Sequence, residues 1–256
     1  MSDKANKNQS SPPQADGKDR IAKVMARAGV CSRRDAEKMI AQGRVQLNGQ
    51  TLDTPAVKVD ENDEIVVDGK PINGPEETRL FLYHKPVGVL TTSRDDRGRQ
   101  TVFDDLPDGL PRLLSVGRLD LNTEGLLLLT NDGALSRYLE LPATGLKRTY
   151  RVRVYGNIDE QALDDLANGI TYEGVHYGAI DAYLEKRTGR NGWVVMTLTE
   201  GKNREIRNVM RALGLQVNRL IRLSYGAFSL DDLDKSEVLE VPPPQIRKLI
   251  PGFYKS

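Results

Sequence analysis

The run of four leucines from Leu126 to Leu129 constrains the fold more than any other segment of the chain. A run with no polar position predicts a short strand that is buried on both faces. Asn131-Asp132-Gly133 follows and predicts the end of that strand, because these residue types form turns. Just before the run, Gly117-Arg118-Leu119-Asp120 places a carboxylate beside an arginine. A short loop held by a rigid strand keeps such a group in a fixed position, as a catalytic carboxylate requires.

The N-terminal part of the chain predicts a tail and a small domain. Residues 1–17 are rich in Ser, Pro, Gln and Lys and are expected to be a disordered tail. In residues 18–72, Ile21, Val24 and Met25 recur at helical spacing, and Ser32 is placed to cap a second helix. Short alternating strands follow, and residues 73–78 have the composition of a linker.

Residues 79–240 predict an α+β catalytic domain with a mixed, largely antiparallel sheet and flanking helices. Its strands and helices do not follow the regular alternation of a parallel sheet. The segments LFLYHKP, LLLLT, RTYRVRVYG, GWVVMTLTE and NRLIRLSYG are typical of strands, whereas ALSRYLEL, DEQALDDLANG and REIRNVMRALG are typical of helices. Residues 241–256 are Pro-rich and are expected to form an irregular C-terminal tail.

Composition excludes several classes of protein. The chain has no apolar run of about 18 residues, which a membrane span would need. Its first residues contain no apolar segment of a secretory signal, and the single Cys31 fits a reducing cytoplasm. Two histidines, His84 and His176, leave little from which to build a zinc site. The common nucleotide, hydrolase and metalloprotease motifs are missing from the sequence, so any catalysis would use carboxylate, arginine, lysine and tyrosine.

The net charge of +1 conceals strong segregation. Residues 18–45 carry eight Lys or Arg against three acids, whereas residues 46–75 carry two against six. Residues 202–222 carry six Lys or Arg against one acid. Two basic segments of this kind predict surfaces that neutralise nucleic-acid phosphates, although a solvated helix face is the alternative for either segment alone.

The string GRLDLNTEGLLLLTNDG, residues 117–133, resembles motif II of the pseudouridine synthases, in the RsuA/RluB/RluE/RluF branch. The strings GRLDLNTEG and GKNREIR are most similar to RluB-type enzymes, which act on a hairpin of large-subunit 23S rRNA. The resemblance covers about residues 18–230. The segment ARAGVCSRRDAEKMIAQGRVQLNG likewise resembles the αL (S-four-like) RNA-binding domain.

The resemblance implies a role for each matching residue of the catalytic domain. Asp120 matches the catalytic aspartate, and Tyr150 matches the tyrosine that stacks on the flipped uracil. Arg207 matches the basic residue that pairs with the aspartate, with Arg204 and Arg211 close enough in the sequence to be alternatives. The preceding Ile206 would pack against the base. Arg118 would fill the gap left by the extruded base, with a local salt bridge to Asp120 or Asp132 as the alternative.

The resemblance also implies an RNA-contacting set outside these residues. In KPVG, a motif I string, Lys85 would shape the wall of the site. The remaining expected RNA contacts are Lys202 and Arg204 of GKNREIR and, in the αL domain, Arg33, Arg34, Lys38 and Arg44.

The resemblance therefore implies a cytoplasmic bacterial enzyme that isomerises uridine to pseudouridine in ribosomal RNA. The isomerisation adds and removes nothing, so no cofactor is expected. The substrate would be a large-subunit precursor or assembly intermediate, and a monomer without membrane contact is expected. The alternatives are a catalytically silent RNA-binding assembly factor, a synthase acting on 16S rRNA or tRNA and, more remotely, a glycosidase that pairs Asp120 with Glu124.

Overall fold

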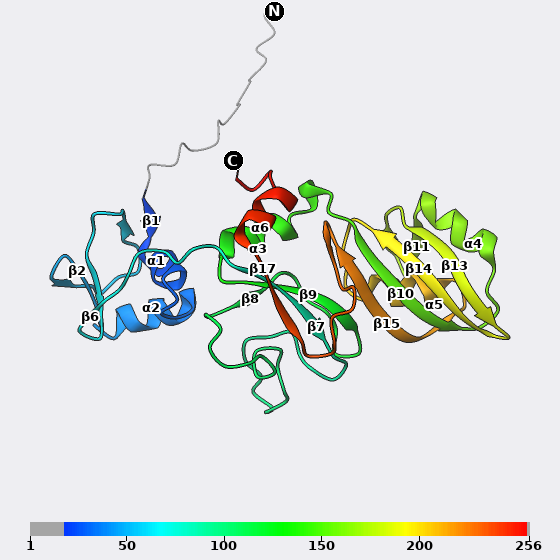
Figure 1. Ribbon diagram of the computed structural model, residues 1–256, viewed down its shortest axis with the longest axis horizontal. Coiled ribbons are helices and arrows are strands. Elements are labelled where there is room, and N and C mark those ends of the chain that lie inside the picture. The colour runs from blue at the N-terminus through cyan, green and yellow to red at the C-terminus, as the bar shows by residue number, and fades with distance from the viewer. Residues whose placement is uncertain (1–17, 255–256) are drawn as a thin grey trace, which may run out of the picture. The chain divides into compact units, whose positions relative to one another are not determined.

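The computed structural model describes residues 18–254, so the tail predicted at residues 1–17 lies outside the described part. The chain divides into two compact units, Met1–Glu76 and Glu77–Ser256 (Figure 1). No helix among the described residues is long and apolar enough to cross a membrane.

The first unit packs two helices against short strands. Ser32 accepts a hydrogen bond from the backbone N–H of Asp35 at 3.1 Å, which confirms the predicted N-cap. Ile21, Met25 and Ile40 are fully buried in its core. The elements are β1 (Asp19–Arg20), α1 (Ile21–Arg27), α2 (Arg33–Ala41), β2 (Val45–Leu47), β3 (Gln50–Thr51), β4 (Lys58–Val59), β5 (Ile65–Val67) and β6 (Lys70–Pro71).

The second unit is built on a nine-stranded sheet whose main path runs β13-β14-β10-β15-β9-β7-β17. Only the β9–β15 pair is parallel among the described strands, which confirms the predicted α+β class. The strands are β7 (Leu80–Lys85), β8 (Leu114–Ser115), β9 (Glu124–Thr130), β10 (Arg148–Tyr155), β11 (Ile170–Tyr172), β12 (Val175–Tyr177), β13 (Asp181–Thr188), β14 (Asn191–Leu198), β15 (Gln216–Tyr225), β16 (Phe228–Ser229) and β17 (Val238–Val241). The helices are α3 (Gly133–Glu140), α4 (Glu160–Asp164), α5 (Glu205–Ala212) and α6 (Pro243–Leu249), with 3₁₀ turns η1 (Pro142–Thr144) and η2 (Asp165–Asn168).

Strand β9 is buried on both faces, as the leucine run predicted. Leu126 and Leu128 belong to one buried cluster, and Leu127 and Leu129 belong to another. All four side chains have no exposed surface. The strand therefore gives the loop before it a rigid base.

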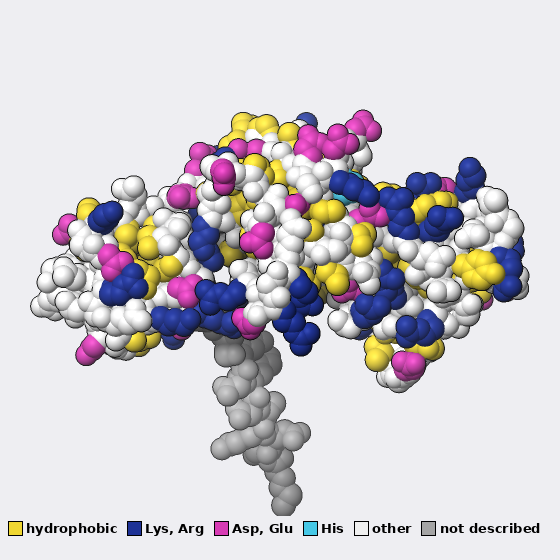
Figure 2. All heavy atoms as spheres, turned by 90° about the horizontal axis from the view of Figure 1, so that it is seen from below, with side chains coloured by type: hydrophobic (Ala, Val, Ile, Leu, Met, Phe, Trp, Pro, Cys, Tyr) yellow, Lys and Arg dark blue, Asp and Glu magenta, His cyan; other side chains and the backbone are white. Residues whose placement is uncertain are grey.

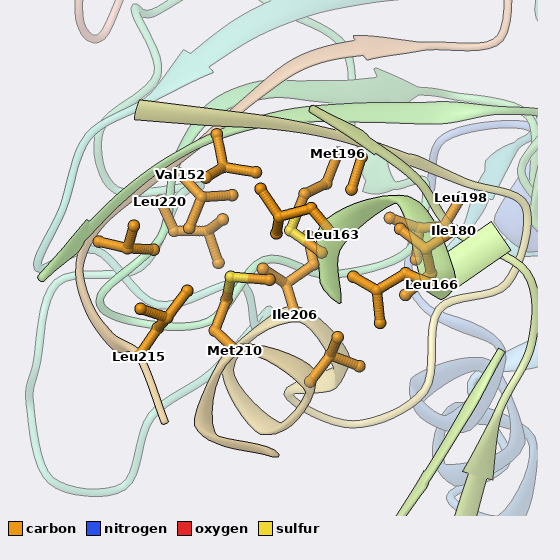
Figure 3. Close-up of a cluster of buried hydrophobic side chains, with 14 of the residues drawn as sticks. Val152, Leu163, Leu166, Ile180, Met196, Leu198, Ile206, Met210, Leu215 and Leu220 are labelled. Atoms are coloured by element: carbon orange, nitrogen blue, oxygen red, sulfur yellow. The ribbon is translucent and has the colours of Figure 1, made fainter. Parts of the chain in front are cut away.

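Helix α5 packs on one face of the β10–β14–β15 part of the sheet. Figure 3 shows Ile206 and Met210 of α5 pointing toward Val152, Met196 and Leu220 of the strands. This packing fixes the helix that carries the basic GKNREIR segment against the strands.

The expectation of an irregular tail at residues 241–256 is wrong. Strand β17 pairs with β7 up to Val241, and α6 follows directly. Ile246 has no exposed surface, and Ile250 is 5% exposed. The prolines at 242–244 suggested irregular backbone, but proline is favoured in the first turn of a helix, where its missing N–H has no partner to lose.

Replacing Ile246 with alanine is expected to lower the free energy of unfolding by about 3 kcal/mol, because it leaves a cavity under α6. Chemical denaturation would measure the change. Gln245→Ala, at an exposed position of the same helix, is the matched control and should change stability by less than about 0.5 kcal/mol. Equal stability of both variants would show that α6 does not belong to the folded core.

Candidate active site

Asp120 lies in the turn that precedes β9. The backbone N–H of Thr123 donates to the Asp120 carbonyl at 3.0 Å, and the N–H of Gly88 donates to the Leu121 carbonyl at 2.9 Å. These bonds tie the turn to itself and to the motif I loop. The Asp120 side chain remains 37% exposed, so its carboxylate is open to a ligand while its backbone is held.

Lys85 lies beneath this turn with no exposed surface. Its Nζ donates to the Pro86 carbonyl and to the Thr123 carbonyl, both at 2.9 Å. The side chain therefore joins the end of β7 to the turn that carries Asp120. Burial lowers the pKa of Lys85 to about 8, while the charges of Asp120 and Glu124 act in the opposite direction.

The lowered pKa of Lys85 makes a testable prediction. Between about pH 8 and its ordinary value of 10.5, folded Lys85 is neutral while unfolded Lys85 is protonated. The unfolded chain then binds more protons, so stability rises with pH in this window. The free energy of unfolding is expected to rise, relative to that of Lys85→Met, by at most about 1.4 kcal/mol per pH unit. Urea unfolding of both chains across the window measures it, and a constant difference would contradict the prediction.

Two arginines lie near Asp120: Arg204, the N-cap of α5, and Arg207 in the first turn of that helix. The Arg204 guanidinium lies 3.7 Å from the Asp120 carboxylate, whereas Arg207 donates to the Asn122 carbonyl at 2.7 Å. The expected direct pairing of Arg207 with Asp120 is therefore replaced by pairing with Arg204, three residues earlier. Arg204 is the N-cap of α5 and has a left-handed backbone, with φ of 50°.

Arg207 still acts on the same loop. Burial lowers its pKa, the charge of Arg204 lowers it further, and the charge of Asp120 raises it. Its bond to the Asn122 carbonyl fixes the loop two residues after the carboxylate. Arg207 therefore holds the loop in position, and Arg204 forms the ion pair with the Asp120 carboxylate.

A buried carboxyl group, Glu205, organises the start of α5. It accepts from the backbone N–H of Lys202 at 2.8 Å, and burial raises its pKa to about 7. The Lys202 ammonium donates to Glu200 and to the His176 carbonyl, both at 2.7 Å. Lys202 is thus anchored at the rim rather than extended into solvent.

Tyr150 lies on β10, half-buried, and packs against the clusters on both sides of it. It is in register with Arg222 of β15. Arg148, two residues earlier, donates to the Tyr225 hydroxyl at 2.8 Å and to the Thr199 carbonyl at 2.7 Å. An aromatic ring thus lies among guanidinium groups that are held by their own partners.

These side chains line one cavity of about 530 Å³. Most of the catalytic-domain residues predicted from the sequence line it, namely Arg118, Asp120, Tyr150, Lys202, Arg204, Ile206 and Arg207. Lys85 is not among the lining residues and supports the turn from behind. Arg118 is exposed and forms no ion pair with any described residue, so the local salt bridge considered for it is not formed.

The cavity also contains residues to which sequence reasoning assigned no role in the site. Arg222 is 2% exposed and donates to the Leu126 carbonyl at 2.7 Å. Glu205 and Tyr225 also line the cavity. Arg148, which the sequence indicated only as one of three basic residues flanking Tyr150, lines it as well. The repeated arginines within RTYRVRV and NRLIRLSY were the available signal, since a strand that only packs a core seldom carries them.

The four basic residues predicted in the first unit differ in how they are engaged. Arg33 and Arg34 are exposed on α2 and form no ion pair with described residues. Lys38 pairs with Asp35 at 3.5 Å. Arg44 forms a two-pronged pair with Asp68, at 2.7 and 2.6 Å, so its guanidinium is already occupied.

No group of three His, Cys, Asp or Glu side chains within residues 18–254 is placed to hold a metal ion. What the cavity offers is the accessible Asp120 carboxylate with an arginine beside it, an aromatic ring, and further guanidinium groups. This arrangement suits a flat, uncharged base whose attached sugar and phosphates lie among cations.

Comparison with known proteins agrees with this chemistry. Residues 79–212 match the RNA pseudouridylate synthase family model, and residues 19–65 match the S4 domain model. An uncharacterized RNA pseudouridine synthase of Rickettsia felis is 48% identical over 87% of this chain and 96% of its own.

Two further sequences and one structure are similar. The ribosomal large subunit pseudouridine synthase B of Haemophilus influenzae is 41% identical over 86% of this chain and 63% of its own length. That of Yersinia pestis is 42% identical over 83% and 69%. A crystal structure of a pseudouridylate synthase matches with a TM-score of 0.63 and 30% identity, over 90% of this chain and 99% of that one. The chain, with an S4 domain before its catalytic domain, belongs to the RNA pseudouridylate synthase family and is an enzyme that converts uridine to pseudouridine in RNA.

Proposed function

We propose that this enzyme modifies a uridine in a hairpin of large-subunit ribosomal RNA, with Asp120 as its catalytic carboxylate. The observation that carries the proposal is the cavity that Asp120, Arg204 and Tyr150 line together. Two relatives named for the ribosomal large subunit, at 41% and 42% identity, support the choice of RNA.

The reaction breaks the bond between N1 and C1′ and joins C5 to C1′, with a proton lost from C5 and one gained at N1. Asp120 supplies the negative charge, by attack at C1′, by addition to the ring, or by removal of a ribose proton to form a glycal. Its ion pair with Arg204 orients the carboxylate in the cavity.

Tyr150 and Ile206 would hold the extruded uracil. Stacking of a base on an aromatic ring contributes about 1–3 kcal/mol, which offsets part of the cost of unstacking the target. Ile206 lines the cavity from the first turn of α5 and is 5% exposed. Arg118, exposed at the opening, would occupy the gap left in the RNA.

The remaining basic residues would bind RNA away from the reacting base. Arg33, Arg34 and Lys38 would contact phosphates, and Arg44 would do so after exchanging its pair with Asp68. We further propose a cytoplasmic monomer that acts on deproteinised precursor RNA or an assembly intermediate. Light scattering of the purified chain tests the monomer.

Tritium release from [5-³H]uridine-labelled RNA tests the activity, because isomerisation exchanges the C5 proton. We expect release from deproteinised large-subunit rRNA and none from small-subunit rRNA or tRNA. Release from either of the latter would reassign the substrate. No release from any of the three, with RNA binding intact, would favour the catalytically silent assembly factor.

A further inference from the structure

The sheet of the second unit has an exposed face at β10, β13 and β14. On β10, Val152 and Val154 are buried in the core beneath α5, whereas Arg153 and Tyr155 between and after them are exposed. Side chains alternate between the two faces of a strand, so these exposed residues lie on the face away from α5. Figure 2 shows Lys and Arg side chains gathered on the part of the second unit that these strands form.

A row of basic side chains crosses this face. Arg153 is in register with Arg219 of β15 on one side and with Trp193 of β14 on the other. Trp193 is in register with Lys186 of β13. Residues in register share a face, so Arg219, Arg153, Trp193 and Lys186 form one row across four strands. We call this set the basic row. It spans roughly 14 Å, because the three spacings between four neighbouring strands are about 4.8 Å each.

Of the charged residues in the basic row, Arg219 alone has an ionic partner among the described residues. Arg153 and Arg219 lie directly opposite each other, an arrangement of like charges that destabilises a strand pair. Arg219 pairs with Glu124, but Arg153 and Lys186 are exposed and form no ion pair with any described residue. A negatively charged partner would remove this repulsion.

Aromatic residues flank the basic row. Tyr183 lies on the same face of β13 and is 54% exposed, with no hydrogen bond or ring contact to a described residue. The ring of Trp193 is covered by the Arg151 guanidinium, 4.4 Å from its centroid, and Arg151 also pairs with Glu185 at 2.7 Å. The ring of Tyr155 is likewise covered, by the Arg190 guanidinium at 5.0 Å from its centroid. Tyr183 is therefore the ring on this face that is open for stacking.

We propose that this face is a second RNA-binding surface, separate from the active-site cavity, with phosphates on the basic row and an unpaired base on Tyr183. Arginine forks match phosphate oxygens, and an exposed ring beside them suits single-stranded RNA. An acidic peptide would use the cations but would leave Tyr183 without a role.

The row begins close to the active site. Arg219 pairs with Glu124, the first residue of β9, which follows the turn that carries Asp120. RNA that extends beyond the modified nucleotide could therefore contact both. The proposal depends on RNA as the substrate of the family and not on which RNA is modified.

Binding of a fluorescent single-stranded oligouridine RNA to the full chain tests the proposal. Lys186→Glu is expected to weaken binding about fivefold and to lower the slope of log affinity against log salt by about 0.7, one lost phosphate contact on a single strand. Tyr183→Ala should weaken binding with little change in the slope, because stacking releases no counterions.

Lys248→Glu provides the matched control, since Lys248 is exposed on α6 and the charge change is the same. If Lys186→Glu and Tyr183→Ala bind RNA with the same affinity and salt slope as Lys248→Glu, the proposal is overturned. An acidic protein would then be the better candidate for the partner of this face. Circular dichroism of Lys186→Glu verifies that it folds. The assay measures binding alone, so a failure of the isomerase proposal would appear separately, in tritium release by the wild-type chain.

Discussion

Replacing Asp120 with asparagine is expected to abolish pseudouridine formation, with a fall of at least about 10³-fold in tritium release, while RNA binding remains. The amide keeps the size of the carboxylate but carries no charge and is a poor nucleophile. Loss of one charge-stabilising group at a transition state reaches about this size. The backbone of the turn is held by the hydrogen bond from the Thr123 N–H to the Asp120 carbonyl and by the bond from Lys85 Nζ to the Thr123 carbonyl. The substitution should therefore not disturb the fold.

Asp108→Asn is the matched control, because Asp108 is exposed in a loop and does not line the cavity. Its tritium release should equal that of the wild type. Release by Asp120→Asn close to the wild-type rate would show that another group carries the chemistry. Equal loss of RNA binding and release would instead show that the substitution disturbed the cavity.

Replacing Gly125 with alanine is expected to destabilise the second unit by about 5 kcal/mol or more. Gly125 has a φ of +109°, and an added Cβ would lie 2.6 Å from the backbone nitrogen of Arg222 and still closer to its carbonyl oxygen. The two residues are partners in the parallel β9–β15 pair. The clash is with backbone atoms that sheet hydrogen bonds hold, so relaxation would break the pairing next to the active site.

Thermal and urea unfolding measure this effect. Gly133→Ala is the matched control: Gly133 is the first residue of α3, and its added Cβ would meet only Leu114 at an ordinary 3.6 Å. That control should be neutral or slightly stabilising, because alanine favours a helix. If Gly125→Ala unfolds like the control, the close approach of β9 and β15 does not contribute to stability.

Features that depend on neighbours in the sequence were predictable. The leucine run implied a strand buried on both faces, and Ser32 implied a helix N-cap; both follow from residues within a few positions of one another. The basic GKNREIR segment was correctly placed at the start of a helix lining the site.

Features that depend on distant pairing were not predictable. The sequence left Arg204 and Arg211 open beside Arg207 as the partner of Asp120. The pairing with Arg204 depends on the position of α5 against β10 and β15. The prolines at the start of α6 gave no indication of a helix there. The helix is held by Ile246, which packs in a buried cluster with residues of β7, β9 and α3 that are distant in the sequence. Arg222 lies at the site because its strand, β15, pairs with both β9 and β10.

The amino-acid sequence by itself determined the family, the α+β class and the residues that carry charge and aromatic surface at the site. It did so because motif strings, strand periodicity and helix caps are local properties of a chain. Only the tertiary structure decided which guanidinium meets Asp120, that Lys85 holds the turn from behind, and that the basic row is exposed. These depend on strand order and register, which bring together side chains from β7, β9, β10 and β15 that are far apart in the chain.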